Sequence, residues 1–169
     1  MIKKYFKIFN LKSGIKLIKP SHFSDKRGTI WTNYKSEFFK GLKFNHDRFT
    51  LAIKNSLRGL HGDHKTWKLI TCHKGKVFCV IVNYNSKKND YLKYQSFYLS
   101  EKNKYIILIP PLMLLGWCSI SKESIFSYKF SYRGDYVDDK DQITVKWNDK
   151  RINIKWPINK PILSKRDSF

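Results

Sequence analysis

The feature that most constrains this chain is a succession of short segments rich in β-branched and aromatic residues, with turn residues between them at fairly regular spacing. Helical periodicity is scarce: only residues 35–41 and, more weakly, the N-terminal residues fit a helix. Many short strands joined by turns are typical of a β-sandwich or barrel. We therefore expect an all-β fold with short helices. Its predicted strands are residues 15–19, 29–34, 44–53, 57–62, 67–72, 76–84, 94–99, 105–109, 124–131, 142–147 and 153–156.

Turn residues predict how some of these strands pair. The turn-like stretch Ser24–Gly28 lies between residues 15–19 and 29–34 and favours an early strand pair. The dipeptide Lys74-Gly75 predicts a hairpin of the two strands that flank it.

No internal repeat, low-complexity segment or linker divides the chain, so we expect a single domain over residues 1–169. Its N-terminal arm is about residues 1–22, and its C-terminal tail is residues 157–169. The tail holds two prolines and is too short to fold alone, so it either packs on the body or stays loose.

The formal net charge of +21 comes mostly from lysines spread over the whole length. A nucleic-acid-binding protein normally concentrates basic residues on one face or helix, so we rank nucleic acid last among the partners. A solvated lysine surface explains the distribution better. Such a surface would also attract a small anionic substrate.

Cys72, Cys79 and Cys118 are an odd number of cysteines, lie in or beside apolar runs and lack C-x-x-C spacing. They are typical of reduced core cysteines in a cytoplasmic protein. The N-terminus shows no signal-peptide pattern. The longest apolar run, residues 106–118, is too short for a membrane span and contains two prolines. We expect a soluble, cytoplasmic protein without a membrane partner.

One stretch, residues 57–69, concentrates the reactive side chains, because Arg58, His61, His64 and two lysines lie within it. Histidine exchanges protons near neutral pH, so His61 beside Arg58 suggests acid–base chemistry on an anionic ligand. A structural histidine bound to a neighbour is the alternative. Regular strand alternation predicts that Arg58 and His61 point to opposite faces, and that the glycines at 59 and 62 admit a ligand close to the backbone.

The sequence leaves the roles of two further cationic residues, Lys68 and Arg27, open. Lys68 lies at an odd offset from His61 and faces the other way, unless the loop at residues 62–65 resets the register. Arg27, in a turn, either grips a phosphate or base edge or is a surface arginine. His61 and His64 lack further ligands at workable spacing, so we predict no metal and no cofactor.

Nine motifs follow one another along most of the chain: Phe23-Ser-Asp-Lys-Arg-Gly28, Leu57-Arg-Gly-Leu-His61, Trp67-Lys-Leu-Ile70, Leu99-Ser-Glu-Lys-Asn103, Ile109-Pro-Pro111, Phe126-Ser-Tyr-Lys129, Lys146-Trp-Asn-Asp149, Ile154-Lys-Trp-Pro157 and Leu163-Ser-Lys-Arg-Asp167. In this order they resemble the dTDP-4-dehydrorhamnose 3,5-epimerase family of sugar-nucleotide epimerases. The stretch from His61 to Lys68 is most similar to a subgroup of capsule and surface-polysaccharide pathways, some of whose members act on GDP-linked 4-keto-heptoses.

The resemblance implies a cupin-type double-stranded β-helix, or jelly roll, that forms a homodimer through N-terminal strands. It also implies epimerisation at C3, C5 or both of a nucleotide-linked 4-keto sugar through an enolate.

The family roles carry over as follows. His61 matches the base, Asp167 its carboxylate partner in a docked tail, Tyr128 the opposing acid and Lys68 the cation near the enolate oxygen. Arg27 and Arg58 match nucleotide and pyrophosphate contacts. His46 lies in the segment that corresponds to the family's nucleotide contact, and His64 is expected to be a loop residue or a further substrate contact.

The sequence departs from the family in two respects. The family's nucleotide-contact segment commonly reads Gln-Asp-Asn before a serine, whereas this chain has His46-Asp-Arg-Phe-Thr50, which leaves the nucleotide base open and suggests Arg48 as an added anion contact. The second respect is a loss of polar groups. After Ile109-Pro-Pro111 the family carries a histidine near a glycine, where this chain has Leu112-Met-Leu-Leu-Gly-Trp117. At Cys79 many members hold a carboxylate. These apolar replacements imply an altered substrate, narrower regiochemistry or lost activity. The alternatives are therefore a 3,4-ketoisomerase of the same fold and an inactive jelly roll that binds sugar nucleotides.

Overall fold

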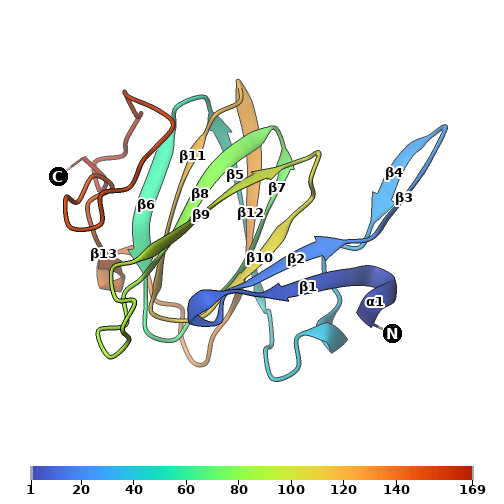
Figure 1. Cartoon of the computed structure of the whole chain (residues 1–169), viewed down its shortest axis with the longest axis horizontal. Helices are drawn as coiled ribbons and strands as arrows, with labels where there is room; N and C mark the ends of the chain where they lie inside the picture. Colours follow the sequence, from blue (N-terminus) through green and yellow to red (C-terminus); the bar gives the residue numbers. More distant parts are fainter. Residues whose placement is uncertain (1, 169) are drawn as a thin grey trace.

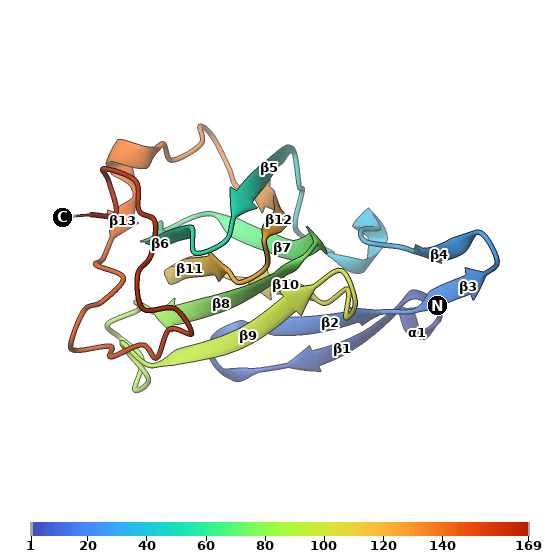
Figure 2. The same cartoon turned by 90° about the horizontal axis from the view of Figure 1, so that it is seen from above.

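The computed structural model describes residues 2–168, whose strands form two facing antiparallel sheets and a separate hairpin (Figures 1 and 2). One sheet has the order β1-β2-β10-β7-β12-β5, the other the order β13-β6-β11-β8-β9, and β3 pairs with β4. The larger sheet holds β1 (Phe6–Asn10), β2 (Lys16–Pro20), β10 (Ile106–Ile109), β7 (Trp67–Lys74), β12 (Glu123–Ser131) and β5 (His46–Ile53). The smaller sheet holds β13 (Ile143–Thr144), β6 (Leu57–Gly62), β11 (Met113–Ser119), β8 (Lys76–Asn83) and β9 (Tyr94–Ser100). The hairpin is β3 (His22–Asp25) with β4 (Gly28–Trp31), and the helices are α1 (Ile2–Tyr5), η1 (Lys12–Gly14), η2 (Ser36–Phe38) and η3 (Asp139–Asp141).

This arrangement confirms the predicted all-β jelly roll. The predicted helix at residues 35–41 is a single 3₁₀ turn, η2, and the N-terminal helical signal is the four-residue α1. No helix among residues 2–168 is long and apolar enough to cross a membrane.

The main core lies between the two sheets, because β8 and β11 are apolar along almost their whole length and bury residues on both faces. Trp117 and Phe126 are its largest fully buried aromatic side chains. Strand β11 was not among the predicted strands, because a continuous apolar run lacks the alternation by which a half-buried strand is recognised.

Two smaller apolar layers cover the outer faces. Residues 145–163 carry Val145, Ile152, Trp156 and Leu163 onto the outside of the smaller sheet. Residues 33–44 place Phe39 on the outer face of the larger sheet, near its N-terminal strands. The chain between β13 and the C-terminal tail is irregular, so the strand predicted at residues 153–156 is wrong and only two residues of 142–147 form a strand.

Both predicted strand pairings are wrong. Strand β2 pairs with β1 and β10, whereas β4 pairs with β3 in the projecting hairpin (Figure 1). The turn at Gly75 exists, but β7 and β8 on either side of it belong to different sheets. A local turn signal therefore marked a crossing from one sheet to the other.

Candidate active site

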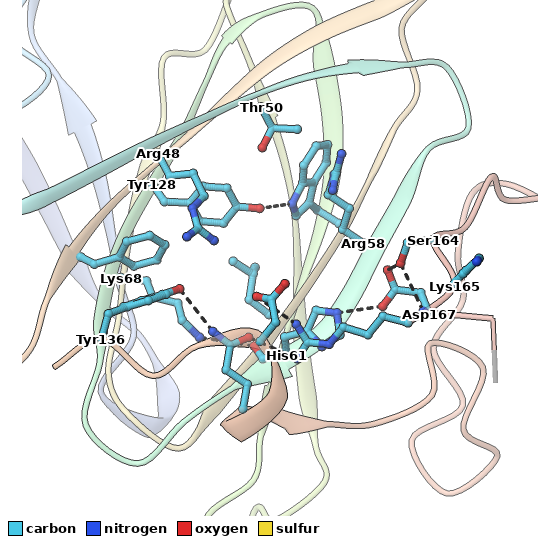
Figure 3. Close-up of a pocket in the computed structure, with 16 residues that line it drawn as sticks. Arg48, Thr50, Arg58, His61, Lys68, Tyr128, Tyr136, Ser164, Lys165 and Asp167 are labelled. Carbon is cyan, nitrogen blue, oxygen red and sulfur yellow. Dashed lines mark hydrogen bonds and ion pairs between the residues drawn. The ribbon is translucent and has the colours of Figure 1, made fainter.

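A cavity of about 390 Å³ opens between the two sheets, next to the C-terminal tail (Figure 3). This volume lies at the small end of the range of ligand pockets. The residues that line it are Arg48, Thr50, Arg58, His61, Lys68, Leu115, Trp117, Tyr128, Phe130, Tyr136, Asp139, Gln142, Ser164, Lys165, Arg166 and Asp167.

His61 and Asp167 form the closest ion pair at the cavity wall, with 2.7 Å between Nε2 and Oδ1 (Figure 3). Burial by itself would raise the pKa of Asp167, but the hydrogen bond and positive charge of His61 hold it below its ordinary value. Ser164 donates a hydrogen bond of 3.0 Å to the other carboxylate oxygen. The arrangement can hold a histidine proton on Nε2, which leaves the Nδ1 lone pair of a neutral imidazole as the basic site.

The C-terminal tail reaches His61 because it runs along the start of β6. Leu57 N–H donates to the carbonyl of Ile162, and Ile162 N–H donates to the carbonyl of Asn55. Leu163 anchors the same segment in the outer apolar layer. The tail therefore packs on the body, and its docking positions Asp167.

A bulge in β6 places Arg58 and His61 on the same cavity, so the predicted strict alternation is wrong. The register between β6 and β11 shifts between Leu115, opposite His61, and Trp117, opposite Arg58. Gly59 has a φ of +115°, and a Cβ there would lie 2.6 Å from the Gly116 Cα. Gly59 therefore permits the bulge and the close approach of β11, rather than the approach of a ligand.

Residues near β13 complete the surroundings of His61. The Nδ1 of His61 lies 3.2 Å from the Thr144 hydroxyl oxygen, which accepts a hydrogen bond of 2.8 Å from Arg166. Arg166 also donates to the side-chain carbonyl of Gln142 and pairs with Asp139 at 3.3 Å. The histidine side of the cavity is therefore polar and charged.

Tyr128 lines the cavity from β12, in the sheet opposite to β6. Its hydroxyl oxygen accepts a hydrogen bond of 2.5 Å from Nε1 of Trp117. Burial raises the pKa of Tyr128 above its ordinary value, although the Trp117 hydrogen bond and the nearby Arg58 and Arg48 act in the opposite direction. The phenol is thus kept neutral and can serve as a proton donor.

Lys68 supplies a buried positive charge from β7, in the sheet that faces β6. Its ammonium group donates a hydrogen bond of 3.3 Å to the carbonyl of His61. Burial lowers the pKa of Lys68 to about 8, a shift that the charge of Asp63 partly opposes. The loop after His61 carries the chain across to the other sheet, which brings Lys68 to the same cavity.

Three predicted substrate contacts lie outside the cavity wall. His64 is exposed in the turn after β6, and His46 packs against Phe130 and Tyr136, which themselves line the cavity. The Arg27 side chain is 82% exposed on the β3–β4 hairpin, where it pairs with Asp25. The cavity brings together the other six predicted residues: Arg48, Arg58, His61, Lys68, Tyr128 and Asp167.

Residues that sequence reasoning missed are the hydrogen-bonding partners of the predicted ones. Trp117 lay in a run interpreted as the loss of polar groups, although an indole N–H is a donor. Thr144 and Gln142 lay in a predicted strand without a functional signal, whereas Arg166 adjoins Asp167 in a recognised motif. Within residues 2–168 no three His, Cys, Asp or Glu side chains are grouped to hold a metal.

The sequence model of the dTDP-4-dehydrorhamnose 3,5-epimerase family matches residues 11–169 of this chain. A protein of that name from Shigella flexneri is 30% identical over 159 residues, which cover 89% of this chain and 86% of the relative. The Legionella pneumophila dTDP-6-deoxy-D-glucose-3,5-epimerase, solved with dTDP-4-keto-L-rhamnose, has a TM-score of 0.89 and 26% identity and covers 96% of this chain and 90% of that chain. The Bacillus anthracis dTDP-4-dehydrorhamnose 3,5-epimerase, solved with TDP and PPi bound, has a TM-score of 0.88 and 27% identity and covers 96% of each chain. The chain therefore belongs to the dTDP-4-dehydrorhamnose 3,5-epimerase family of sugar-nucleotide epimerases.

Proposed function

We propose that the protein epimerises C3, C5 or both of a nucleotide-linked 4-keto-6-deoxy sugar through an enolate, without a metal. The observation that carries this proposal is the opposition of His61 and Tyr128, which face one cavity from different sheets. Epimerisation needs a base on one face of the sugar and an acid on the other. The presence of Tyr128 favours epimerisation over 3,4-ketoisomerisation.

The proposed reaction begins at a carbon next to the C4 ketone. Nδ1 of neutral His61, once the Thr144 hydroxyl has turned away from it, takes the proton. The C–H electron pair forms the enolate, whose negative charge develops on O4. The Lys68 ammonium stabilises that charge, and Asp167 stabilises the imidazolium. Tyr128 then donates its proton to the carbon from the opposite face. Proton transfer from the imidazolium through solvent restores the phenol, so the cycle involves no net redox change.

Arg58 and Arg48 are the proposed contacts of the pyrophosphate, because guanidinium groups bind phosphate oxygens with two parallel hydrogen bonds. Both line the cavity beside Tyr128. The dTDP sugars named for the relatives and a GDP-linked 4-keto-heptose are the two candidate substrates. The second candidate rests on the motif from His61 to Lys68 and places the reaction in capsule or surface-polysaccharide biosynthesis.

We also propose a homodimer. Phe49, Leu51 and Ile53 point to one side of the edge strand β5 and are 60–64% exposed. Phe23 and Ile30 on the projecting hairpin are 64% and 70% exposed. A second copy of this chain would cover these apolar side chains, and the hairpin would carry Arg27 toward the partner's cavity. The cytoplasm is the proposed location, in keeping with the free, buried state of all three cysteines.

The decisive test is incubation in D₂O with a dTDP-linked 4-keto-6-deoxyhexose and, in parallel, a GDP-linked 4-keto-heptose. Proton NMR should show deuterium at C3 or C5 and inversion of configuration at the same carbon for one of the two. Nucleotide binding without any exchange, even at high protein concentration, would instead indicate an inactive sugar-nucleotide-binding jelly roll. Movement of the carbonyl to C3 would indicate a 3,4-ketoisomerase.

A further inference from the structure

Trp117 and Tyr128 bridge the two sheets on the side of the cavity opposite His61. Trp117 belongs to β11 and Tyr128 to β12, and their hydrogen bond is the dashed line from the Tyr128 hydroxyl in Figure 3. Leu115, two residues before Trp117, also lines the cavity. The indole is therefore the polar group that this apolar segment contributes to the site.

The chemistry of the two groups fixes the direction of the bond. An indole N–H can only donate, whereas a phenol oxygen has one proton to donate and lone pairs to accept with. The Tyr128 oxygen must be the acceptor, so its own proton is not used in this contact. Within residues 2–168, no other group accepts that proton, which leaves it available to a molecule in the cavity.

Packing prevents the indole from turning away. Trp117 is 1% exposed and stacks on Phe126, with 4.5 Å between ring centroids and 23° between planes. Phe126 also contacts the Tyr128 ring edge to face at 5.0 Å, and Phe130 stacks on the other side of Tyr128 at 5.5 Å. Both partners of the hydrogen bond are thus held by aromatic neighbours.

We propose that Trp117 is a positioning residue that directs the Tyr128 hydroxyl proton into the cavity, so that the enolate is protonated on the face opposite His61. This inference rests on the proposed function. When Tyr128 donates, its O–H bond breaks and the enolate electron pair forms the new C–H bond. The resulting phenolate keeps the indole N–H as a hydrogen-bond donor and lies near the positive charges of Arg58 and Arg48.

The same hydrogen bond favours the acidity that the step needs. Burial raises the pKa of Tyr128, and donation from Trp117 lowers it. Loss of the indole N–H would make the phenol a weaker acid and would free its hydroxyl to rotate. The imidazolium of His61 would then return the proton to the face from which it came. Solvent exchange would continue, whereas inversion would fail.

The test is Trp117→Phe, which keeps an aromatic ring to stack on Phe126 and removes the N–H. In D₂O we expect the rate of deuterium exchange at the reacting carbon to stay within about threefold of the rate in the unmodified protein. The rate of inversion should fall about tenfold or more, because part of the general-acid contribution is lost. Trp156→Phe is the matched control, because Trp156 makes a similar bond, 2.8 Å to the Trp147 carbonyl, in the outer apolar layer. Its ratio of exchange to inversion should not change.

A double-mutant cycle separates positioning from general damage to the core. If Trp117 acts through Tyr128, Trp117→Phe should have no further effect on inversion in a Tyr128→Phe background, because coupled residues are not additive. Equal loss of exchange and inversion, or full additivity with Tyr128→Phe, would overturn the inference. Neither exchange nor inversion in the unmodified protein, with either substrate, would instead overturn the proposed function on which it rests.

A measurement without substrate tests the hydrogen bond directly. The chain has five tryptophans, so ¹⁵N-labelled protein should give five indole signals by NMR. We expect the Trp117 signal, assigned as the one lost in Trp117→Phe, to shift in Tyr128→Phe. If Trp117→Phe is too unstable to study, the spectrum of Tyr128→Phe alone still tests the hydrogen bond. A set of indole signals that is unchanged in Tyr128→Phe would contradict the hydrogen bond.

Discussion

The two sides of the cavity differ in the residues that surround the proposed base and the proposed acid. On the base side, His61 is surrounded by hydrogen-bonding groups, and its carboxylate partner comes from an irregular tail. On the acid side, Tyr128 lies among aromatic rings on a regular strand. A base must gain a positive charge during the reaction, which polar neighbours stabilise, whereas an acid must begin neutral, which burial favours. The contrast shows how one cavity can hold two proton-transfer groups with opposite demands.

The largest expected effect is on the base side. His61→Asn should reduce exchange and inversion together by about 10²- to 10⁴-fold, the usual contribution of a general base. Measurement of both rates in D₂O checks this, with Tyr128→Phe as the comparison, since that variant should slow inversion far more than exchange. Loss of inversion alone in His61→Asn would reverse the assignment of the two sides.

Asp167→Asn comes next, because an amide cannot stabilise the imidazolium. Both rates should fall by about ten- to a hundredfold with their ratio unchanged, in line with the loss of about 1.5–3 kcal/mol from one hydrogen bond to a charged group. The variant should also change the acid stability of the protein. The folded-state pKa of Asp167 lies below its unfolded value, so its contribution is present above the unfolded pKa and is lost as the pH falls through the folded pKa. Thermal unfolding should therefore differ between variant and parent at neutral pH and converge in acid. A constant difference would contradict the ion pair.

Lys68 should limit activity at alkaline pH, since its pKa is lowered to about 8. Above that pH it loses the charge proposed to stabilise the enolate, and the rate of exchange should decline. Between about pH 8 and the ordinary value of 10.5 the folded protein binds fewer protons than the unfolded chain at this group, so its contribution to stability increases with pH. Deprotonation of Lys68 therefore does not itself destabilise the fold, and thermal unfolding measured over the same pH range separates the loss of activity from unfolding. Lys68→Arg should move the decline upward, because arginine stays charged, and an unmoved pH profile would exclude Lys68.

The smallest effect is expected at Ser164, whose hydroxyl donates to Asp167. Ser164→Ala should slow both rates only a few-fold, in line with the loss of about 1 kcal/mol from one hydrogen bond. Ser168→Ala is a suitable control, because within residues 2–168 the Ser168 hydroxyl bonds only to the Lys165 carbonyl, at the exposed end of the tail. A larger effect at the control than at Ser164 would show that the tail is held in another way.

The sequence was sufficient to predict the fold class, most strands and several of the residues that line the cavity. Alternation identified most strands, but it could not assign them to sheets, because partners such as β5 and β12 lie far apart in the chain. Strand β11 was not predicted because both of its faces are buried, so its sequence is continuously apolar and does not alternate. Pairing in a sandwich depends on which apolar faces meet, and a single sequence does not contain that information directly.

At the site, residue types predicted the reactive groups, but regular strand geometry did not predict the directions of their side chains. The stretch at residues 57–69 predicted a reactive histidine, yet the bulge at Gly59 overturned the predicted directions of Arg58 and His61. The pairing of Asp167 with His61 came from resemblance rather than spacing. Trp117 was missed because an aromatic residue in an apolar run is ordinarily core, and its N–H matters only once Tyr128 is known to face it.

The single glycine between β7 and β8 has a consequence for how the molecule can assemble. Gly75 leads the chain from one sheet directly into the other, and a Cβ there would lie 2.2 Å from the carbonyl oxygen of Glu123. Strand β7 therefore pairs with β10 and β12, whereas β8 pairs with β9 and β11 in the other sheet, so neither sheet can be completed before the other has begun. Folding that depends on such distant contacts is slow. We expect separately expressed halves of the chain to aggregate, and refolding to require the intact chain.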